Sequence, residues 1–281
     1  MENLKDKSFE TLFETFKEAF VDYEMQLNKD ELQRMLTRRG FAPELSFGAF
    51  DGNKMVAFTF NGVGEFNGKK TAYDTGTGTV EDYRGRGLAT EIFLYSLPSL
   101  KEAGISQYLL EVLQHNTKAV SLYQKLGFEV TREFSYFVQK NEEVKVGPKQ
   151  VNSSIEIKPI ELSQITKLED AFDFHPSWQN TFHSVFRIPD EFKAVGAFTQ
   201  NQLVGYCVTE MKSGDVTQMA VDKNYRRMGI GTLLFKEIMA LNQHHSVKVI
   251  NTTVDCESVT GLMKSLAIPE VGKQFEMIKK L

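Results

Sequence analysis

Apolar residues recur at helical spacing along the first part of the chain. Two consecutive stretches place them on one face, at Phe9, Leu12, Phe13, Phe16 and Phe20 and then at Leu27, Leu32, Met35 and Leu36. Half-buried strands are expected next, near residues 44–50, 55–63 and 72–80, where apolar and polar residues alternate between turn residues. This opening predicts two helices that pack on a sheet.

The pattern then changes to alternating helices and strands. A helix is expected over 87–103, although Pro98 should kink it or end it early because an interior proline costs about 3 kcal/mol. A strand over 107–114 and a helix over 116–126 follow, and Gly127 stops that helix. Short strands over 128–130 and 134–139 are expected to close the unit.

The same order of elements occurs twice. Gly48-Ala49-Phe50 opens a predicted hairpin, and Gly196-Ala197-Phe198 opens a similar one later. Each hairpin leads to a strand, an arginine- and glycine-containing loop, a helix, a strand and another helix. We therefore predict a first domain over 1–142, a polar linker over 143–153 and a second domain over 154–281.

Composition is that of an ordinary soluble globular protein. The chain has 281 residues, 41% of them hydrophobic and 25% charged, and a net charge of −4. This balance gives no reason to expect nucleic acid or an anionic membrane as a partner. The two cysteines form no C-x-x-C pair, and no signal peptide or membrane-spanning run is visible, so a cytoplasmic location is expected. His244-His245 lacks partners at metal-ligand spacing, so no metal site is predicted.

The loop Arg84-Gly85-Arg86-Gly87-Leu88-Ala89 joins a Thr/Gly strand to a helix. A helix N-terminus presents unpaired backbone N–H groups and a partial positive charge, which together favour an anion. Glycine lets a ligand approach the backbone, and arginine offers forked donors to phosphate oxygens. We interpret the loop as a pyrophosphate site. A second copy, Arg226-Arg227-Met228-Gly229-Ile230-Gly231, occurs in the same context.

A further motif follows the first loop, N-x-x-A-x-x-L-Y-x-x-x-G-F over residues 116–128. Together the motifs resemble those of the GNAT superfamily of acyl-CoA-dependent N-acetyltransferases, in a tandem arrangement. The resemblance implies an α/β (α+β) fold with two GNAT-like domains, each a splayed mixed β-sheet flanked by helices. It also implies acetyl-CoA as the cosubstrate, with its pantetheine arm held where the sheet opens.

The resemblance implies roles for particular residues. Tyr123 follows Glu111 by 12 residues, a spacing similar to that of family members that acetylate peptide N-termini. Carried over, Glu111 is the general base and Tyr123 the general acid, with Asp74 and Glu81 as alternative bases. A backbone N–H near Val80 would polarise the thioester carbonyl. The expected cofactor-binding residues are Val80, Arg84, Gly85, Arg86, Gly87, Leu88, Ala89, Thr90 and Asn116 in the first domain and Arg226, Arg227, Gly229 and Gly231 in the second.

The second domain keeps the loop but not the chemical groups. Laid over the first without gaps, it has Met263 for Tyr123, Asn251 for Glu111 and Cys256 for Asn116. Methionine cannot donate a proton, and asparagine is no base at neutral pH. The first domain is therefore expected to catalyse the reaction. A catalytic base in the second domain remains an alternative, because Asp215 occupies the place of Asp74.

The predicted function is transfer of an acetyl group from acetyl-CoA to a primary amine. A non-catalytic acyl-CoA sensor or scaffold, and catalysis in the second domain, remain alternatives; RNA binding through RGRG is disfavoured by the acidic balance. The helices before residue 40 and the aromatic segment 134–137 should border the acceptor pocket. That favours an apolar or aromatic amine or a peptide end, and the sequence fixes neither the acceptor nor the oligomeric state.

Overall fold

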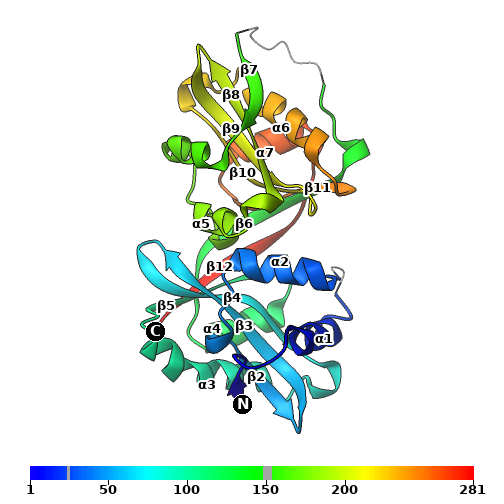
Figure 1. Ribbon diagram of the computed structural model, residues 1–281, viewed down its shortest axis with the longest axis vertical. Coiled ribbons are helices and arrows are strands. Elements are labelled where there is room, and N and C mark those ends of the chain that lie inside the picture. The colour runs from blue at the N-terminus through cyan, green and yellow to red at the C-terminus, as the bar shows by residue number, and fades with distance from the viewer. Residues whose placement is uncertain (24–25, 148–153) are drawn as a thin grey trace. The chain divides into compact units, whose positions relative to one another are not determined.

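The computed structural model describes residues 1–23, 26–147 and 154–281. It divides into two compact units, one formed by Met1–Thr131 with Phe275–Leu281 and the other by Arg132–Gln274. Both are mixed sheets flanked by helices, as the sequence predicts (Figure 1). Within the described ranges, no helix is long and apolar enough to cross a membrane.

The first unit orders its strands β1-β2-β3-β4-β5-β12. The elements up to residue 140 are β1 (Glu2–Asn3), α1 (Phe9–Ala19), α2 (Lys29–Arg39), β2 (Phe47–Asp51), β3 (Lys54–Phe66), β4 (Lys69–Thr79), α3 (Leu88–Glu102), β5 (Gln107–Leu113), α4 (Thr117–Lys125) and β6 (Glu129–Lys140). From β1 to β4 each neighbouring pair of strands is antiparallel, whereas β4 and β5 are parallel. The antiparallel pairing therefore ends at β4.

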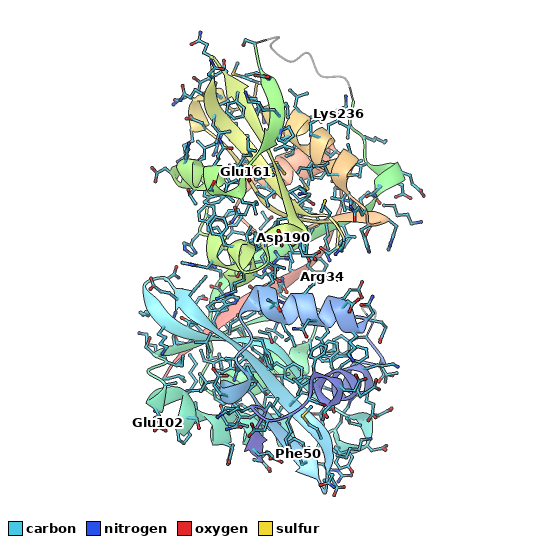
Figure 2. The ribbon with its side chains drawn as sticks, in the orientation of Figure 1. Arg34, Phe50, Glu102, Glu161, Asp190 and Lys236 are labelled. Carbon is cyan, nitrogen blue, oxygen red and sulfur yellow. The ribbon has the colours of Figure 1, made fainter. Side chains whose placement is uncertain are left out.

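Helices cover both faces of this sheet. The predicted apolar face of α1 and α2 packs on Phe58 and Phe60 of β3, and these helices lie in front of the strands in Figure 1. On the other face, α3 packs on Phe47 and Val56, and α3 and α4 pack on β5. Phe50, labelled in Figure 2, lies near the end of β2, and the Lys7 ammonium is 4.3 Å above its ring. The core thus holds β4 and β5 between two helical layers.

The second unit orders its strands β6-β11-β10-β9-β8-β7. Its remaining elements are β7 (Glu156–Ile160), α5 (Phe182–Phe186), β8 (Phe192–Thr199), β9 (Gln202–Glu210), β10 (Asp215–Val221), α6 (Ile230–Leu241), β11 (Ser246–Thr253), α7 (Glu257–Ser265) and β12 (Glu270–Lys280). Here too one neighbouring pair, β10 and β11, is parallel, so the second unit repeats the plan of the first.

The closing strands differ from the sequence prediction. Strand β6 begins in the first unit, but from Arg132 it belongs to the second, where it pairs with β11. Strand β12 begins in the second unit, and from Phe275 it belongs to the first, beside β5. The compact units therefore do not coincide with the continuous ranges 1–142 and 154–281. Of the predicted linker 143–153, residues 148–153 lie outside the described residues.

Helix α3 also differs from the prediction, because it continues through Pro98 to Glu102. The carbonyl that loses its hydrogen bond belongs to Leu94, four residues earlier. Both Pro98 and Leu94 are exposed, so water can satisfy that carbonyl without a break in the helix.

Candidate active site

The first unit's sheet opens between β4 and β5. Their pairing runs only from Thr71 with Gln107 to Tyr73 with Leu109, and no further pairs join the two strands among the described residues. Beyond that point β4 continues to Thr79 and β5 to Leu113. A bulge in β4 at Thr75, where Gly76 pairs with Phe60 and Asp74 with Asn61, turns the strand at the start of the opening.

The cofactor loop leads from the end of β4 into α3. Gly85 and Gly87 have positive φ values of 76° and 81°, and a Cβ atom at either position would meet nothing within 4 Å. Gly87 precedes the first turn of α3 and no side chain caps it. None of the backbone N–H groups of residues 85–90, all within the described chain, has a hydrogen-bond partner. The expected residues Leu88, Ala89 and Thr90 supply three of these groups, so the loop fits a pyrophosphate.

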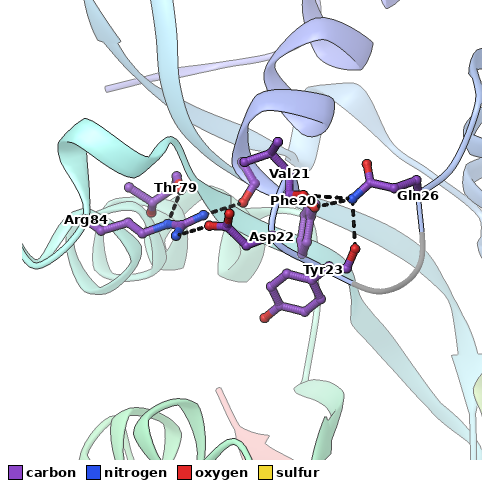
Figure 3. Close-up of polar contacts among 8 residues, drawn as sticks. Phe20, Val21, Asp22, Tyr23, Gln26, Thr79 and Arg84 are labelled. Atoms are coloured by element: carbon purple, nitrogen blue, oxygen red, sulfur yellow. Dashed lines mark hydrogen bonds and ion pairs between the residues drawn. The ribbon is translucent and has the colours of Figure 1, made fainter.

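The arginines of the loop have other contacts than those predicted. The Arg84 guanidinium donates to the carbonyls of Thr79 and Ala19 and to the carboxylate of Asp22 (Figure 3). Arg86 donates to the Asp82 carbonyl and lies over the Tyr83 ring. Arg84 therefore joins elements of the fold, and the groups of the loop that remain without a partner are its backbone N–H groups.

Tyr123 lies beside the opening, on the face covered by α3 and α4. Its hydroxyl donates to Oδ2 of Asp74 over 3.2 Å. Asp74 also accepts hydrogen bonds from the Thr77 hydroxyl at 2.7 Å and the Gly76 N–H at 2.9 Å. Next to this pair is a cavity of about 10 Å³, with Ala89 and Phe93 of α3 in its wall. The sequence predicted Tyr123 as an acid but not its bond to Asp74.

Burial governs the protonation of this pair. It raises the pKa of Asp74, against the lowering effect of its three hydrogen bonds. Burial, followed by the charge of Asp74, raises the pKa of Tyr123 well above its ordinary value. The phenol is consequently protonated at neutral pH, as a proton donor must be.

Glu111 lies on the opposite face of the sheet. Its Oε2 accepts a hydrogen bond of 3.1 Å from the hydroxyl of Tyr73, the residue before Asp74 on β4. Neighbouring residues of a strand point to opposite faces of the sheet. Tyr73 and Glu111 therefore lie on the face covered by α2, and Asp74 lies on the face covered by α4, the helix that carries Tyr123. The Arg39 guanidinium of α2 lies 6.0 Å from the Tyr73 ring centre, consistent with that placement. The structure thus puts the predicted base and acid on the two sides of the opening.

Three other predicted residues are partly engaged by the fold. The Val80 N–H donates to the Val56 carbonyl, so that amide itself is not available to polarise a thioester. Asn116 caps α4 through Oδ1, which accepts from the Ala119 N–H, and this leaves its Nδ2 for a ligand. Glu81 is exposed in the turn after β4.

Asp74→Asn should stabilise the protein increasingly as pH rises. The folded-state pKa of Asp74 is above its ordinary value of 3.8, so the folded state binds more protons than the unfolded state between the two pKa values. Its stability then falls with pH across that window, by at most about 1.4 kcal/mol per pH unit. Asparagine removes this dependence. Denaturant unfolding of both proteins from pH 4 to 8 measures the difference, with exposed Asp82→Asn as the control. A difference that does not change with pH contradicts the assignment.

The second unit lacks the carboxylates and the phenol of the first. Asn251 donates to Ser177 and accepts from Gln274, and it is fully buried. The bulge of β10 falls at Thr217, which matches Thr75, so Asp215 corresponds to Tyr73 and Val216 to Asp74. The expectation that Asp215 replaces Asp74 is therefore wrong.

Buried apolar side chains lie close to the second loop. Met263 of α7, and Leu266 just after that helix, are fully buried in one cluster with Ile230 of α6. A Cβ atom on Gly231 would lie 3.4 Å from Leu262, whereas Gly229 has a φ of 83° like Gly87. In the first unit, by contrast, α4 has no buried residue. Arg227 is exposed and has a φ of 64°, so the second loop keeps the backbone shape of the first.

Comparison with known proteins places both units in one family. Residues 9–128 match the acetyltransferase (GNAT) family model, and residues 191–261 match an acetyltransferase (GNAT) domain model. The N-alpha-acetyltransferase MAK3 of Arabidopsis thaliana is 30% identical over 124 residues, which are 43% of this chain and 63% of that protein. Mycothiol acetyltransferase of Thermobifida fusca is 31% identical over 121 residues, 40% of this chain and 38% of that protein.

Solved structures share the fold at low identity. A tandem GNAT protein from the clavulanic acid biosynthesis pathway has a TM-score of 0.74 at 12% identity, with 100% of this chain and 97% of that chain covered. A GCN5-related N-acetyltransferase from Sphaerobacter thermophilus has a TM-score of 0.73 at 14% identity, with 96% and 91% covered. The chain belongs to the GNAT acetyltransferase family and carries two GNAT domains in tandem.

Proposed function

We propose that this protein transfers the acetyl group of acetyl-CoA to a primary amine, and that the first unit performs the chemistry. The observation that carries the proposal is the placement of Glu111 and Tyr123 on the two sides of the opening between β4 and β5. An amine approaching from the α2 side would meet a carboxylate, and a thiol leaving towards α4 would meet a phenol. Bound acetyl-CoA supplies an activated thioester and a thiol leaving group.

Each residue then has a defined task. Glu111, supported by the Tyr73 hydroxyl, accepts the proton that an ammonium must lose before its nitrogen can attack. Tyr123, held by Asp74, donates a proton on the thiol side. The backbone N–H groups of residues 85–90 hold the pyrophosphate, and Asn116 Nδ2 is placed to contact the pantetheine arm. The second unit serves as a structural partner, because Asn251, Met263 and Val216 stand in place of Glu111, Tyr123 and Asp74.

Peptide N-termini are the first acceptors to test. The relatives include two N-alpha-acetyltransferases, and an N-terminal amine is a primary amine with an adjacent side chain. Small amines form the second group, since mycothiol acetyltransferase is also a relative. The chain spans 63% and 65% of the two N-alpha-acetyltransferases. Release of CoA in the presence of each acceptor group tests the activity directly.

Calorimetric titration should show one acetyl-CoA per chain. Gly87→Asp should weaken this binding more than about tenfold, because an N-cap carboxylate occupies the same N–H groups and repels a phosphate. Gly229→Asp is the matched control, since Gly229 has the same position and nearly the same φ in the second unit. It should leave the affinity within about twofold. Binding lost only in Gly229→Asp would assign the cofactor site to the second unit, and two bound molecules per chain would contradict a purely structural second unit.

A further inference from the structure

Arg84 ties the cofactor loop to the end of α1. Its Nε donates to the Thr79 carbonyl over 3.2 Å, Nη1 to Oδ2 of Asp22 over 2.9 Å, and Nη2 to the Ala19 carbonyl over 3.0 Å (Figure 3). Thr79 ends β4 and Ala19 ends α1, so one side chain joins three elements. A single exposed ion pair contributes little to the stability of the fold. A planar guanidinium that donates to three acceptors nevertheless holds them in a defined arrangement.

The segment that Arg84 holds is a turn with satisfied carbonyls. Gln26 Nε2 donates to the carbonyls of Phe20, Val21 and Tyr23 over 2.8, 3.2 and 2.8 Å (Figure 3). The Tyr23 ring meets the Phe20 ring edge-on, with 4.9 Å between their centres. The backbone is thus fixed from both sides, while the side chains of Val21 and Tyr23 remain 57% and 48% exposed.

The segment lies along the part of β4 that no longer pairs with β5. A Cβ atom on Gly78 would lie 3.0 Å from the Ala19 side chain, and one on Gly76 would lie 3.9 Å from the Phe16 ring. Helix α1 packs together with α2, which covers the face that carries Glu111. The exposed aromatic side chain of Tyr23 is therefore suited to contact an acceptor that enters from this face.

The second unit has the same arrangement of an arginine with two carbonyls and an aspartate, so this arrangement is a feature of the fold. Arg226 donates to the carbonyls of Val221 and Ala171 over 3.0 Å each and to Asp173 over 2.7 Å. Asp173, however, also accepts a hydrogen bond from Ser258 of α7. The corresponding Asp22 side chain is 59% exposed, against 28% for Asp173. The contact in the first unit is therefore free to respond to a ligand, whereas that in the second is fixed to α7.

We propose that Arg84 is a positioning residue that couples acetyl-CoA binding to the acceptor side, by transmitting the ordering of loop 85–90 to the segment 19–23 along β4. The inference rests on the proposed function. Its physical basis is that N–H groups without partners become fixed when a pyrophosphate binds them, and Arg84 is the covalent neighbour of the first of them. The ordering reaches Ala19 and Asp22 through its guanidinium.

Amide hydrogen exchange with and without acetyl-CoA tests the coupling and needs no acceptor. In the wild type, acetyl-CoA should slow exchange in peptides covering 84–92 and in those covering 16–23. In Arg84→Ala it should still slow exchange over 84–92, with the dissociation constant within about threefold, but the slowing over 16–23 should be lost. Arg226→Ala, the matched variant of the second unit, should keep both effects.

Two further results decide the inference. Asp22→Asn, a milder change at the surface, should reduce the slowing over 16–23 and raise the acceptor KM about fivefold or more, with kcat nearly unchanged. Loss of acetyl-CoA binding in a folded Arg84→Ala protein would make Arg84 a phosphate ligand and overturn the inference. Unchanged slowing over 16–23 in both variants would overturn it as well. A wild type that binds no acetyl-CoA would instead remove the proposed function, and the inference with it.

Discussion

Replacing Tyr123 by phenylalanine should lower kcat by about 10²- to 10⁴-fold, the usual range for a positioned general acid. The substitution removes only the hydroxyl that donates to Asp74. The ring packs edge-on against Phe128, with 5.5 Å between the ring centres, and that contact is kept. Acetyl-CoA affinity should therefore stay within about twofold. Steady-state kinetics give kcat, and calorimetric titration gives the affinity.

Tyr83→Phe is the matched control for this substitution. Its hydroxyl also donates to a carboxylate, that of Asp51, but it lies on the turn before the loop and away from the opening. It should leave kcat within about twofold. An equal fall in both variants, or an unchanged kcat in Tyr123→Phe, would move the proton donor to another residue. A fall in acetyl-CoA affinity alone would make Tyr123 a binding residue.

The sequence was sufficient to predict the glycine-containing turn before α3 and the helix that carries Tyr123, because both depend on local motifs. Their roles in binding and catalysis remain predictions. Asp74 as the partner of Tyr123, and Tyr73 as the partner of Glu111, were missed. Their positions depend on the bulge at Thr75, which fixes which side of β4 each residue faces, and no pattern within the strand marks it.

Arg84 was assigned to phosphate for a similar reason. An arginine beside glycines is typical of an anion site, and nothing nearby in the sequence indicates that Asp22 and Ala19 lie within reach. The glycines of β4 are a related case. At Gly78 a Cβ atom would lie 2.7 Å from the Phe58 ring of β3 and 3.0 Å from the Ala19 side chain of α1. The contacts of Arg84 and Gly78 are thus set by residues that are distant in the sequence.

The order of elements along the chain in the repeated units could be predicted, but not which closing strand belongs to which sheet. Phe134 and Phe137 of β6 and Phe275 and Met277 of β12 present similar apolar side chains. Either strand could close either sheet by pattern alone. The structure places Phe137 in the second core and Met277 in the first. The first unit is therefore made of two separate stretches of chain, whereas the second is the continuous stretch Arg132–Gln274.

Ending the chain after Gln274 should unfold the first unit, although residues 275–281 lie far in sequence from Glu111 and Tyr123. The deletion removes the strand beside β5 and, with it, Met277, which is fully buried. Glu276 also loses its bond with the Thr131 hydroxyl, and Leu281 N–H its bond with the Ser106 carbonyl. One buried methionine replaced by a cavity already costs about 2–5 kcal/mol, against a total stability of about 5–15 kcal/mol.

The full-length variant Met277→Ala separates this effect from the general damage of a truncation. It should lower the unfolding free energy of the first unit by about 2–5 kcal/mol and reduce the temperature range over which acetyl-CoA binds. Met263→Ala is the matched control, since Met263 is equally buried but belongs to the second core. Thermal unfolding followed with and without acetyl-CoA distinguishes the two: the ligand should raise the transition of the first unit only. If a chain of residues 1–142 alone bound acetyl-CoA with full affinity, β12 would be dispensable, because the first unit would then close its sheet with its own β6.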